Sequence, residues 1–454
     1  MTKSGCPTSF EFRHSNFSLY TAGRMLPYLT PEFPGVGGVI KQRAEDFFVQ
    51  EIPLYEASGN GEHVYCEIQK IGLTTFEAMH RLGKALDVST RDIGYAGMKD
   101  AHAITRQLFS IAGTTPEAVM ALQIPGITVQ WAARHGNKLR LGHLLGNRFA
   151  IKIRDVNPLD VVKLKPVLDV IARRGMPNFF GEQRFGRRNN NDLLGAALIR
   201  GDHETVLKQL LGSPDPALDS KATLEARTAF DKRDNARAMQ LWPRTGGIER
   251  RVLARLMKTH RPSAAIHAID DKIRRLWVSA VQSRLFNDVL AKRISTIDKL
   301  FDGDLAYKHD NGACFRVESA ATEQPRCEAF EISPTGPLVG YRMTLPEGKP
   351  LAIEQEAMKA ITLTAADFKQ SGKMRVKGAR RSLRIKPENL DIAGGVDEFG
   401  SHITVAFTLP AGAFATVLLR ELMKSDDVAD EAESQPLTDS AEADIEVESA
   451  GEAE

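Results

Sequence analysis

The segment 94–107, GYAGMKDAHAITRQ, combines small, acidic and basic residues in a pattern that can do chemistry. Its only carboxylate, Asp100, directly follows Lys99 and stands two residues before His102. The two glycines before it allow the backbone to approach a ligand closely, and neighbouring cations keep a carboxylate ionised. Asp100 is therefore a candidate nucleophile or the anchor of an ion pair. The alternative is an ordinary surface turn.

The sequence carries no recognisable metal or nucleotide motif. Asp100 and His102 match half of a metal-hydrolase DxH pair, but the eleven histidines are dispersed, with no HxH or HExxH partner. The four cysteines form no CxxC pair, and GVGGVIK (35–41) lacks the spacing of a phosphate-binding loop. We therefore expect an activity that needs no metal, nucleotide or redox cofactor.

Two basic segments are candidates for contact with RNA. NFFGEQRFGRR (178–188) alternates phenylalanines with Arg184, Arg187 and Arg188. Aromatic faces stack on bases and arginines bind phosphates, so this mixture favours a single-stranded RNA contact. KMRVKGARRSLRIK (373–386) has seven basic residues and no acidic one. The alternative for the first segment is that its phenylalanines belong to the core and its arginines to a solvated loop, and for the second that it is a basic surface loop.

The charge is divided unevenly along the chain. Residues 425–454 hold twelve acidic residues and no lysine or arginine, which predicts a disordered acidic tail. Without them, 60 basic residues stand against 46 acidic ones, a balance that favours a polyanionic partner such as nucleic acid, although solubility alone is the alternative. No apolar run is long enough for a membrane span, and the N-terminus lacks a signal-peptide core, so we expect a cytoplasmic protein.

Alternating and helical patterns predict the elements that position these residues. Strands are expected at 40–52, 62–72, 146–156 and 402–409, and helices at 74–86, 158–175, 265–294 and 410–423. In the third strand Asn147, Phe149, Ile151 and Ile153 share one face, and Arg148 points away from them. Strands at both ends and a mainly helical middle indicate an α+β domain with an insertion.

The motifs together resemble the TruD family of tRNA pseudouridine synthases. AGMKDAHAITRQ is similar to the family's catalytic motif, and further segments follow in the family's order: KQRAEDFFVQE (41–51), GNRF (146–149), PNFFGEQRFG (177–186) and LPAGAFATVLLREL (409–422). SPTGPLVG (333–340) and ARRSLRIKP (379–387) also fit. Several ordered motifs are far more specific than any one alone, and the resemblance covers about residues 36–424.

The resemblance implies a role for individual residues. Asp100 matches the nucleophile, and Phe47, Asn147, Phe149 and Phe414 match positions that line the target nucleotide. The substrate would be a uridine of transfer RNA, uridine 13, converted to pseudouridine, and the protein is expected to be a monomer without a protein partner. Candidate phosphate contacts are Lys41, Lys99, Arg184, Arg187 and Arg188.

The resemblance also implies a pseudouridine-synthase α+β core with a second α/β domain inserted. The predicted parts are an N-terminal arm (1–35), the first part of the core (36–174), the insertion (175–385), the last strand and helix of the core (386–424) and the tail (425–454). A non-catalytic RNA-binding protein of the same fold is the alternative, which a retained Asp100 disfavours. The residues do not distinguish attack by the aspartate from deprotonation of the ribose.

Overall fold

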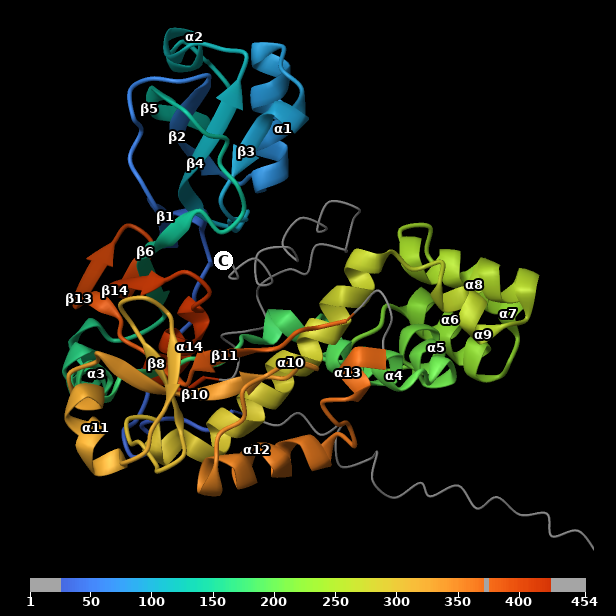
Figure 1. Ribbon diagram of the computed structural model, residues 1–454. Helices are drawn as coiled ribbons and strands as arrows, with labels where there is room; N and C mark the ends of the chain where they lie inside the picture. Colours follow the sequence, from blue (N-terminus) through green and yellow to red (C-terminus); the bar gives the residue numbers. More distant parts are fainter. Residues whose placement is uncertain (1–25, 371–374, 426–454) are drawn as a thin grey trace, which may run out of the picture.

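The computed structural model describes residues 26–370 and 375–425, and its largest sheet is mixed (Figure 1). Seven strands lie in the order β13-β14-β6-β1-β4-β2-β5, and β3 pairs with β4. The strands are β1 (Phe47–Pro53), β2 (His63–Ile71), β3 (Ile93–Tyr95), β4 (Ile104–Ala112), β5 (Ile127–His135), β6 (Leu144–Arg154), β13 (Glu388–Asp397) and β14 (Gly400–Pro410). The β1–β4 pair is parallel and the other pairs are antiparallel.

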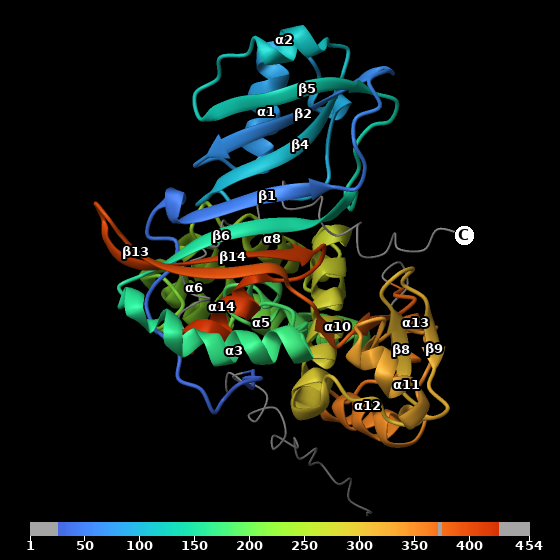
Figure 2. The ribbon, with the colours of Figure 1, turned by 90° about the vertical axis from the view of Figure 1, so that its left-hand side faces the viewer.

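Helices α1 (Thr75–Leu86), α3 (Val161–Arg174) and α14 (Ala415–Met423) lie along this sheet (Figure 2). Helix α1 begins with a capping box, in which Thr74 accepts from the Glu77 amide and the Glu77 carboxylate accepts from the Thr74 amide. Short helix α2 (Pro116–Met120) lies at the tip of the upper lobe, which is the part at the top of Figure 1 that contains α1 and strands β2 to β5. Apolar residues on the covered face of the sheet alternate with exposed ones, as for Phe149 and Arg148, which confirms the alternation predicted for 146–156.

The chain between β7 (Met176–Pro177) and β12 (Arg384–Ile385) forms a second body, and these two short strands pair with each other. A helical bundle contains α4 (Asn191–Arg200), α5 (His203–Leu211), α6 (Lys221–Asp231), α7 (Asn235–Leu241), α8 (Gly247–Thr259) and α9 (Pro262–Ile266). Helix α10 (Asp271–Arg293) crosses the centre of the molecule and packs on α4, α12 and β10 (Figure 1). The predicted division at 175 and 385 thus falls where the two strands meet.

The second body also contains a small sheet that the mainly helical reading of the middle of the chain missed. Its strands lie in the order β11-β10-β8-β9, and three helices accompany it. The elements are β8 (Leu305–Lys308), β9 (Cys314–Arg316), β10 (Ile332–Leu338), β11 (Ala379–Ser382), α11 (Ala320–Glu328), α12 (Gly348–Ala360) and α13 (Asp367–Gln370). Its strands are only three to seven residues long, so they carry little periodicity.

Two predicted helices have other bounds in the structure. The helix expected over 265–294 is interrupted, because the Asp270 carboxylate accepts from the Lys272 amide at 2.8 Å and caps the start of α10. The helix expected over 410–423 begins only at Ala415. Residues 26–35, predicted as part of an irregular arm, pack against α14: the Leu29 amide donates to the buried Glu421 carboxylate at 2.6 Å. Residues 1–25 and the acidic tail lie outside the described residues, except Ser425.

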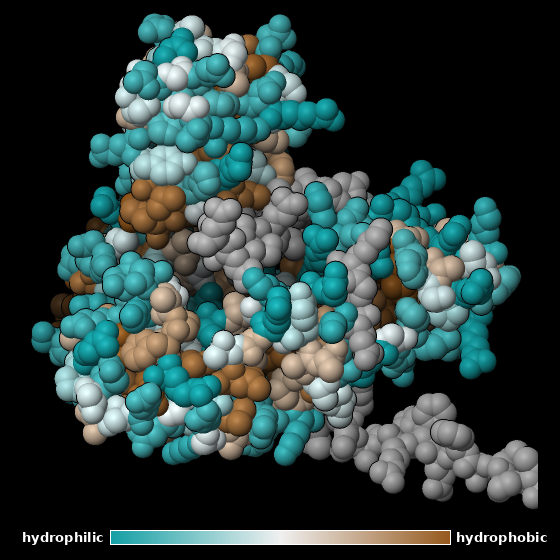
Figure 3. Space-filling model, in the orientation of Figure 1, coloured by the Kyte–Doolittle hydropathy of each residue, from teal (hydrophilic) through white to brown (hydrophobic). Residues whose placement is uncertain are grey.

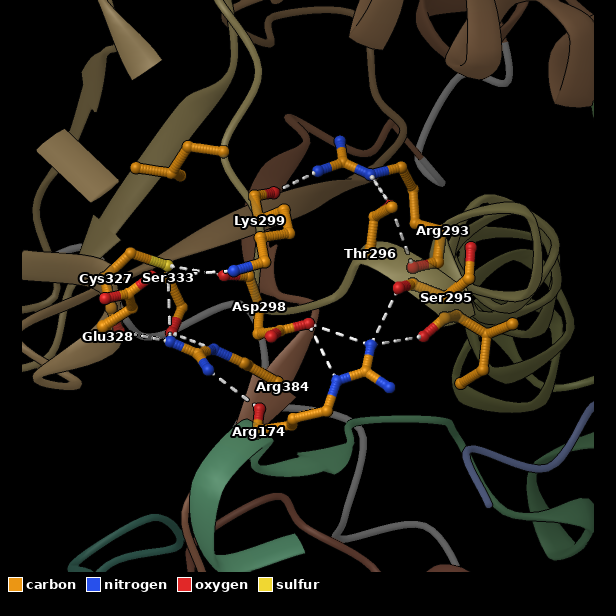
Figure 4. A network of polar contacts seen from close by, with 12 residues as sticks. Arg174, Arg293, Ser295, Thr296, Asp298, Lys299, Cys327, Glu328, Ser333 and Arg384 are labelled. Carbon is orange, nitrogen blue, oxygen red and sulfur yellow. Dashed lines mark hydrogen bonds and ion pairs between the residues drawn. The ribbon is translucent and has the colours of Figure 1, made fainter. Parts of the chain in front are cut away.

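A buried polar network joins the two bodies where the chain passes between them (Figure 4). The Arg384 guanidinium donates to the carbonyl oxygens of Arg174 and Cys327 at 2.8 and 2.5 Å and to the Ser333 hydroxyl at 3.1 Å. Arg174, at the end of α3, pairs with Asp298. Arg384 is completely buried, so each of its donors requires a partner, and these partners come from both bodies.

The surface in Figure 3 is mainly hydrophilic, and hydrophobic residues gather below the upper lobe, near β1 and β6. Exposed large apolar residues include Leu54 and Leu145. Within residues 26–370 and 375–425, no helix has both the length and the apolar character needed to cross a membrane.

Candidate active site around Asp100

Asp100 lies in the loop between β3 and β4, and its side chain is 29 % exposed. Its Oδ2 forms an ion pair and a hydrogen bond with the ammonium of Lys41, and its Oδ1 accepts from the His102 amide at 3.0 Å. Partial burial alone would raise the pKa of Asp100, but the charge and hydrogen bond of Lys41 and the His102 amide together lower that pKa below its usual value. The carboxylate is therefore ionised and still open to a ligand.

Lys41 approaches Asp100 from a segment 59 residues earlier in the chain. Its backbone adopts φ 59°, a left-handed conformation that is uncommon for a lysine. Its side chain is only 8 % exposed, and its ammonium lies 4.7 Å from the centre of the Phe47 ring. The Lys41 ammonium therefore binds mainly the Asp100 carboxylate. Because the side chain is nearly buried, it is poorly accessible for the phosphate contact predicted from the sequence.

Buried polar groups hold the residue before Asp100. The Lys99 ammonium pairs with Glu51 of β1 at 2.7 Å, and both side chains are at most 6 % exposed. The Lys99 amide donates to the Thr75 hydroxyl at 3.0 Å, and that hydroxyl donates to Gln107 at 3.0 Å. Burial raises the pKa of Glu51, and the nearby Lys99 opposes this rise. Lys99 thus lies below the surface, where it cannot reach a phosphate without leaving Glu51.

Three of the predicted nucleotide-lining residues share the covered face of the sheet. Phe47 and Phe149 lie on the neighbouring strands β1 and β6, with Phe149 opposite Val49. Asn147 lies opposite Glu51, and its buried Oδ1 has no hydrogen-bond partner among the described residues. An unsatisfied buried acceptor is costly, and a ligand donor at this point would remove that cost.

The fourth residue, Phe414, comes from the turn that precedes α14 and borders the second body. Its ring centre lies 6.0 Å from that of Phe180, and a Cβ at Gly181 would lie 3.3 Å from the Phe414 ring. Arg381 of β11 donates to the Gly412 carbonyl at 2.8 Å and lies 4.2 Å from the Phe180 ring centre. Residues near both ends of the insertion therefore support the position of Phe414.

The three predicted arginines of 178–188 differ in their surroundings. Arg184 donates to the Ser283 hydroxyl at 3.3 Å, and exposed Arg187 donates to the Leu218 carbonyl at 2.6 Å. Arg188 forms an ion pair with Asp219, which is nearly buried, and donates to the Ser213 carbonyl at 2.5 Å. Among these three, Arg187 keeps its charge most accessible, and Arg188 would have to exchange partners to bind RNA. The phenylalanines Phe179, Phe180 and Phe185 are buried, as the core alternative for them expected.

Sequence reasoning missed the groups beneath the loop. Lys70 is completely buried and donates to the carbonyls of Leu73 and Asp100 at 2.6 and 3.0 Å. Glu51 lies within the KQRAEDFFVQE motif but was given no role. A lysine near the end of an alternating strand, on its apolar face with Ile68, was the available signal for Lys70.

Within the part of the chain that the structure describes, no three histidine, cysteine, aspartate or glutamate side chains gather as metal ligands. The Asp100 side chain contacts the Lys41 ammonium and the His102 amide, and the Phe47 ring lies beside Lys41. Such a set can hold a carboxylate ionised next to a stacked base, which suits nucleophilic chemistry on a nucleoside.

Comparison with known proteins identifies the family. The family model of TruD, tRNA pseudouridine synthase D, matches residues 25–422. The chain is 45 % identical over 404 residues to tRNA pseudouridine synthase D of Geotalea daltonii, covering 88 % of this chain and all of that protein. It is 47 % identical to the Geobacter sulfurreducens protein of the same name, over 87 % and 96 % of the two chains.

The fold agrees with a solved structure. A crystal structure assigned as tRNA pseudouridine synthase D (TruD) from Methanosarcina mazei superimposes with a TM-score of 0.79 at 28 % identity, over 89 % of this chain and 97 % of that one. The predicted α+β class and the family resemblance are both confirmed. This chain belongs to the TruD family of tRNA pseudouridine synthases.

Proposed function

We propose that the protein isomerises a uridine of transfer RNA, uridine 13, to pseudouridine, with Asp100 as the nucleophile. The observation that carries the proposal is the half-buried carboxylate of Asp100, ionised by Lys41, in a motif of the matched family. A protein that only binds RNA has no use for an accessible carboxylate that a neighbouring lysine keeps ionised. The same site therefore supports an enzyme over the non-catalytic alternative.

In the proposed reaction an Asp100 oxygen bonds to C1′ of the ribose while the C1′–N1 bond breaks and its electron pair leaves with uracil. The uracil turns, C5 attacks C1′, and the bond to Asp100 breaks. C5 then loses its proton and N1 gains one, so the product is an isomer of the substrate. Deprotonation of the ribose by Asp100 is the alternative route. Neither route consumes a cofactor.

The proposal is supported by four residues that would contact the uridine once it is flipped out of the RNA: Phe47, Asn147, Phe149 and Phe414. Extruding a base from structured RNA costs about a few kcal/mol, and aromatic stacking offsets part of that cost. The free Oδ1 of Asn147 is an acceptor that suits the N3–H of uracil. Residues 175–385 would act as the inserted domain that binds the rest of the RNA, with Arg187 as a phosphate contact.

Asp100→Asn tests the proposal, because it keeps the shape of the side chain and removes the nucleophilic charge. We expect pseudouridine formation to fall by at least about 10⁴-fold while tRNA binding survives. Asp87→Asn is the matched control, since Asp87 caps α1 in a left-handed conformation that asparagine also adopts. Substantial turnover by Asp100→Asn would refute the nucleophile, and mapping the product to another nucleotide would refute only uridine 13.

A further inference from the structure

Lys70 is a buried cation directly beneath the catalytic loop, which is the loop between β3 and β4 that carries Asp100. Nothing in the matched motifs assigns Lys70 a role. It stands near the end of β2, on the helix-covered face, and its side chain has no contact with solvent. A lysine is rarely buried without a carboxylate partner, because removing its charge from water is costly. Its position therefore calls for a specific reason.

The ammonium of Lys70 is satisfied by three main-chain carbonyls. It donates to Leu73 at 2.6 Å, to Asp100 at 3.0 Å and more weakly to Lys99 at 3.4 Å. Leu73 directly precedes the cap of α1, and Lys99 and Asp100 form the centre of the catalytic loop. One side chain thus connects β2, the start of α1 and the backbone of Asp100. An ammonium has three donors, so none remains for another partner.

The charge of Lys70 also acts on the carboxylate above it. Burial lowers the pKa of Lys70 to about 8, and the charge of Asp100 opposes this decrease. The other charges that face Lys70 are Lys99 from the loop, which lowers its pKa further, and Glu77 of α1, which raises it. Because electrostatic coupling is reciprocal, Lys70 must in turn favour the ionised form of Asp100.

We propose that Lys70 is a positioning residue for the reaction of Asp100: its ammonium fixes the backbone at Lys99 and Asp100 and helps to keep the Asp100 carboxylate ionised. The proposal rests on the proposed function, since it assigns Lys70 a role only through Asp100. Lys70 is buried under the loop, so it acts without touching the RNA. This distinguishes it from Lys41, which contacts the carboxylate itself.

Two variants separate the two effects. Lys70→Met keeps most of the length and removes both the charge and the donors, whereas Lys70→Gln removes the charge and keeps two of the three donors. We expect Lys70→Met to lower kcat by about 10- to 100-fold with less than about a threefold change in KM. For both variants, the acid limb of the pH profile of kcat/KM should move upward by about half a pH unit or more, because Asp100 loses a stabilising cation.

Lys138→Met is the matched control, because Lys138 lies in the same lobe and donates to a carbonyl, that of Arg91, away from Asp100. It should leave the pH profile unchanged. An unchanged acid limb in folded Lys70→Met and Lys70→Gln would overturn the proposal even if Asp100→Asn is inactive. An active Asp100→Asn would instead overturn the nucleophile of the proposed function, so the two failures can be told apart.

A measurement on the native side chain covers the case in which the Lys70 variants do not fold. In protein with ¹⁵N-labelled lysine side chains, the Lys70 ammonium should titrate well below the surface lysines, near pH 8. In Asp100→Asn that titration should move to still lower pH, because the opposing charge of Asp100 is gone. A Lys70 titration that is the same in both proteins would refute the coupling.

Discussion

The cations around Asp100 and Arg187 of the segment 178–188 are all basic side chains, but they occupy opposite environments. Lys41, Lys70 and Lys99 are nearly or fully buried and bind a carboxylate or carbonyls of the protein. Arg187, by contrast, is exposed. A basic residue in a nucleic-acid enzyme can thus act on the protein's own carboxylate, and burial distinguishes that use from phosphate binding.

The largest effect is expected for a buried cation whose partner is also buried. Lys99→Met leaves the Glu51 carboxylate without its counter-charge, so the free energy of unfolding should fall by about 3–5 kcal/mol. Urea unfolding measures this loss. Adding Glu51→Met should restore most of the stability, because a buried ion pair can often be replaced by apolar residues. A single variant as stable as the parent would contradict the structural use of Lys99.

The next effect concerns the direct partner of Asp100. Lys41→Met should lower kcat by about 10- to 100-fold and shift the acid limb of the activity profile to higher pH, since Lys41 helps to lower the pKa of Asp100. A depressed carboxyl pKa contributes stability above its unfolded pKa, and that contribution is lost as pH falls through the folded pKa. The parent should therefore lose more stability on acidification than Lys41→Met. Parallel unfolding curves against pH would argue against the ion pair.

A smaller effect is expected where the insertion contacts the turn before α14. Arg381→Met removes the donor to the Gly412 carbonyl beside Phe414, and we expect about a tenfold loss in kcat/KM, mainly in kcat. Arg375→Met is the control, because Arg375 is an exposed cation of the same basic segment. Equal effects of the two substitutions, confined to KM, would show that Arg381 acts as a phosphate contact instead.

The smallest effect is expected at the surface. Arg187→Ala should weaken tRNA binding by about threefold and reduce the slope of log affinity against log salt by about one, without affecting kcat on bound tRNA. Arg188→Ala should instead destabilise the fold, because nearly buried Asp219 would lose one of its two ion-pair partners and keep only Arg227. Filter binding at several salt concentrations and thermal unfolding distinguish the two. The same salt slope in Arg187→Ala and the parent would remove Arg187 from the RNA surface.

The fold class follows from the sequence alone, and so does the proposal of Asp100 as the centre of the candidate site. Alternation placed Asn147 and Phe149 on one face because side chains of a strand alternate strictly, and the structure agrees. The motif around Asp100 pointed to the family because several short segments occur in one order, and the family match confirms it. Local patterns suffice for such features, because neighbours in the chain carry them.

The partners of the basic residues, by contrast, depend on the tertiary structure. Lys41 and Asp100 are 59 residues apart, and Lys70 binds main-chain carbonyls, which every residue has and no residue type marks. Arg188 looked like a phosphate ligand until the structure paired it with Asp219, 31 residues later. The environment of a charge depends on which distant segments fold over it. The strength and the sign of its effect on a neighbouring carboxylate therefore follow from burial and distance, which the order of residues alone does not contain.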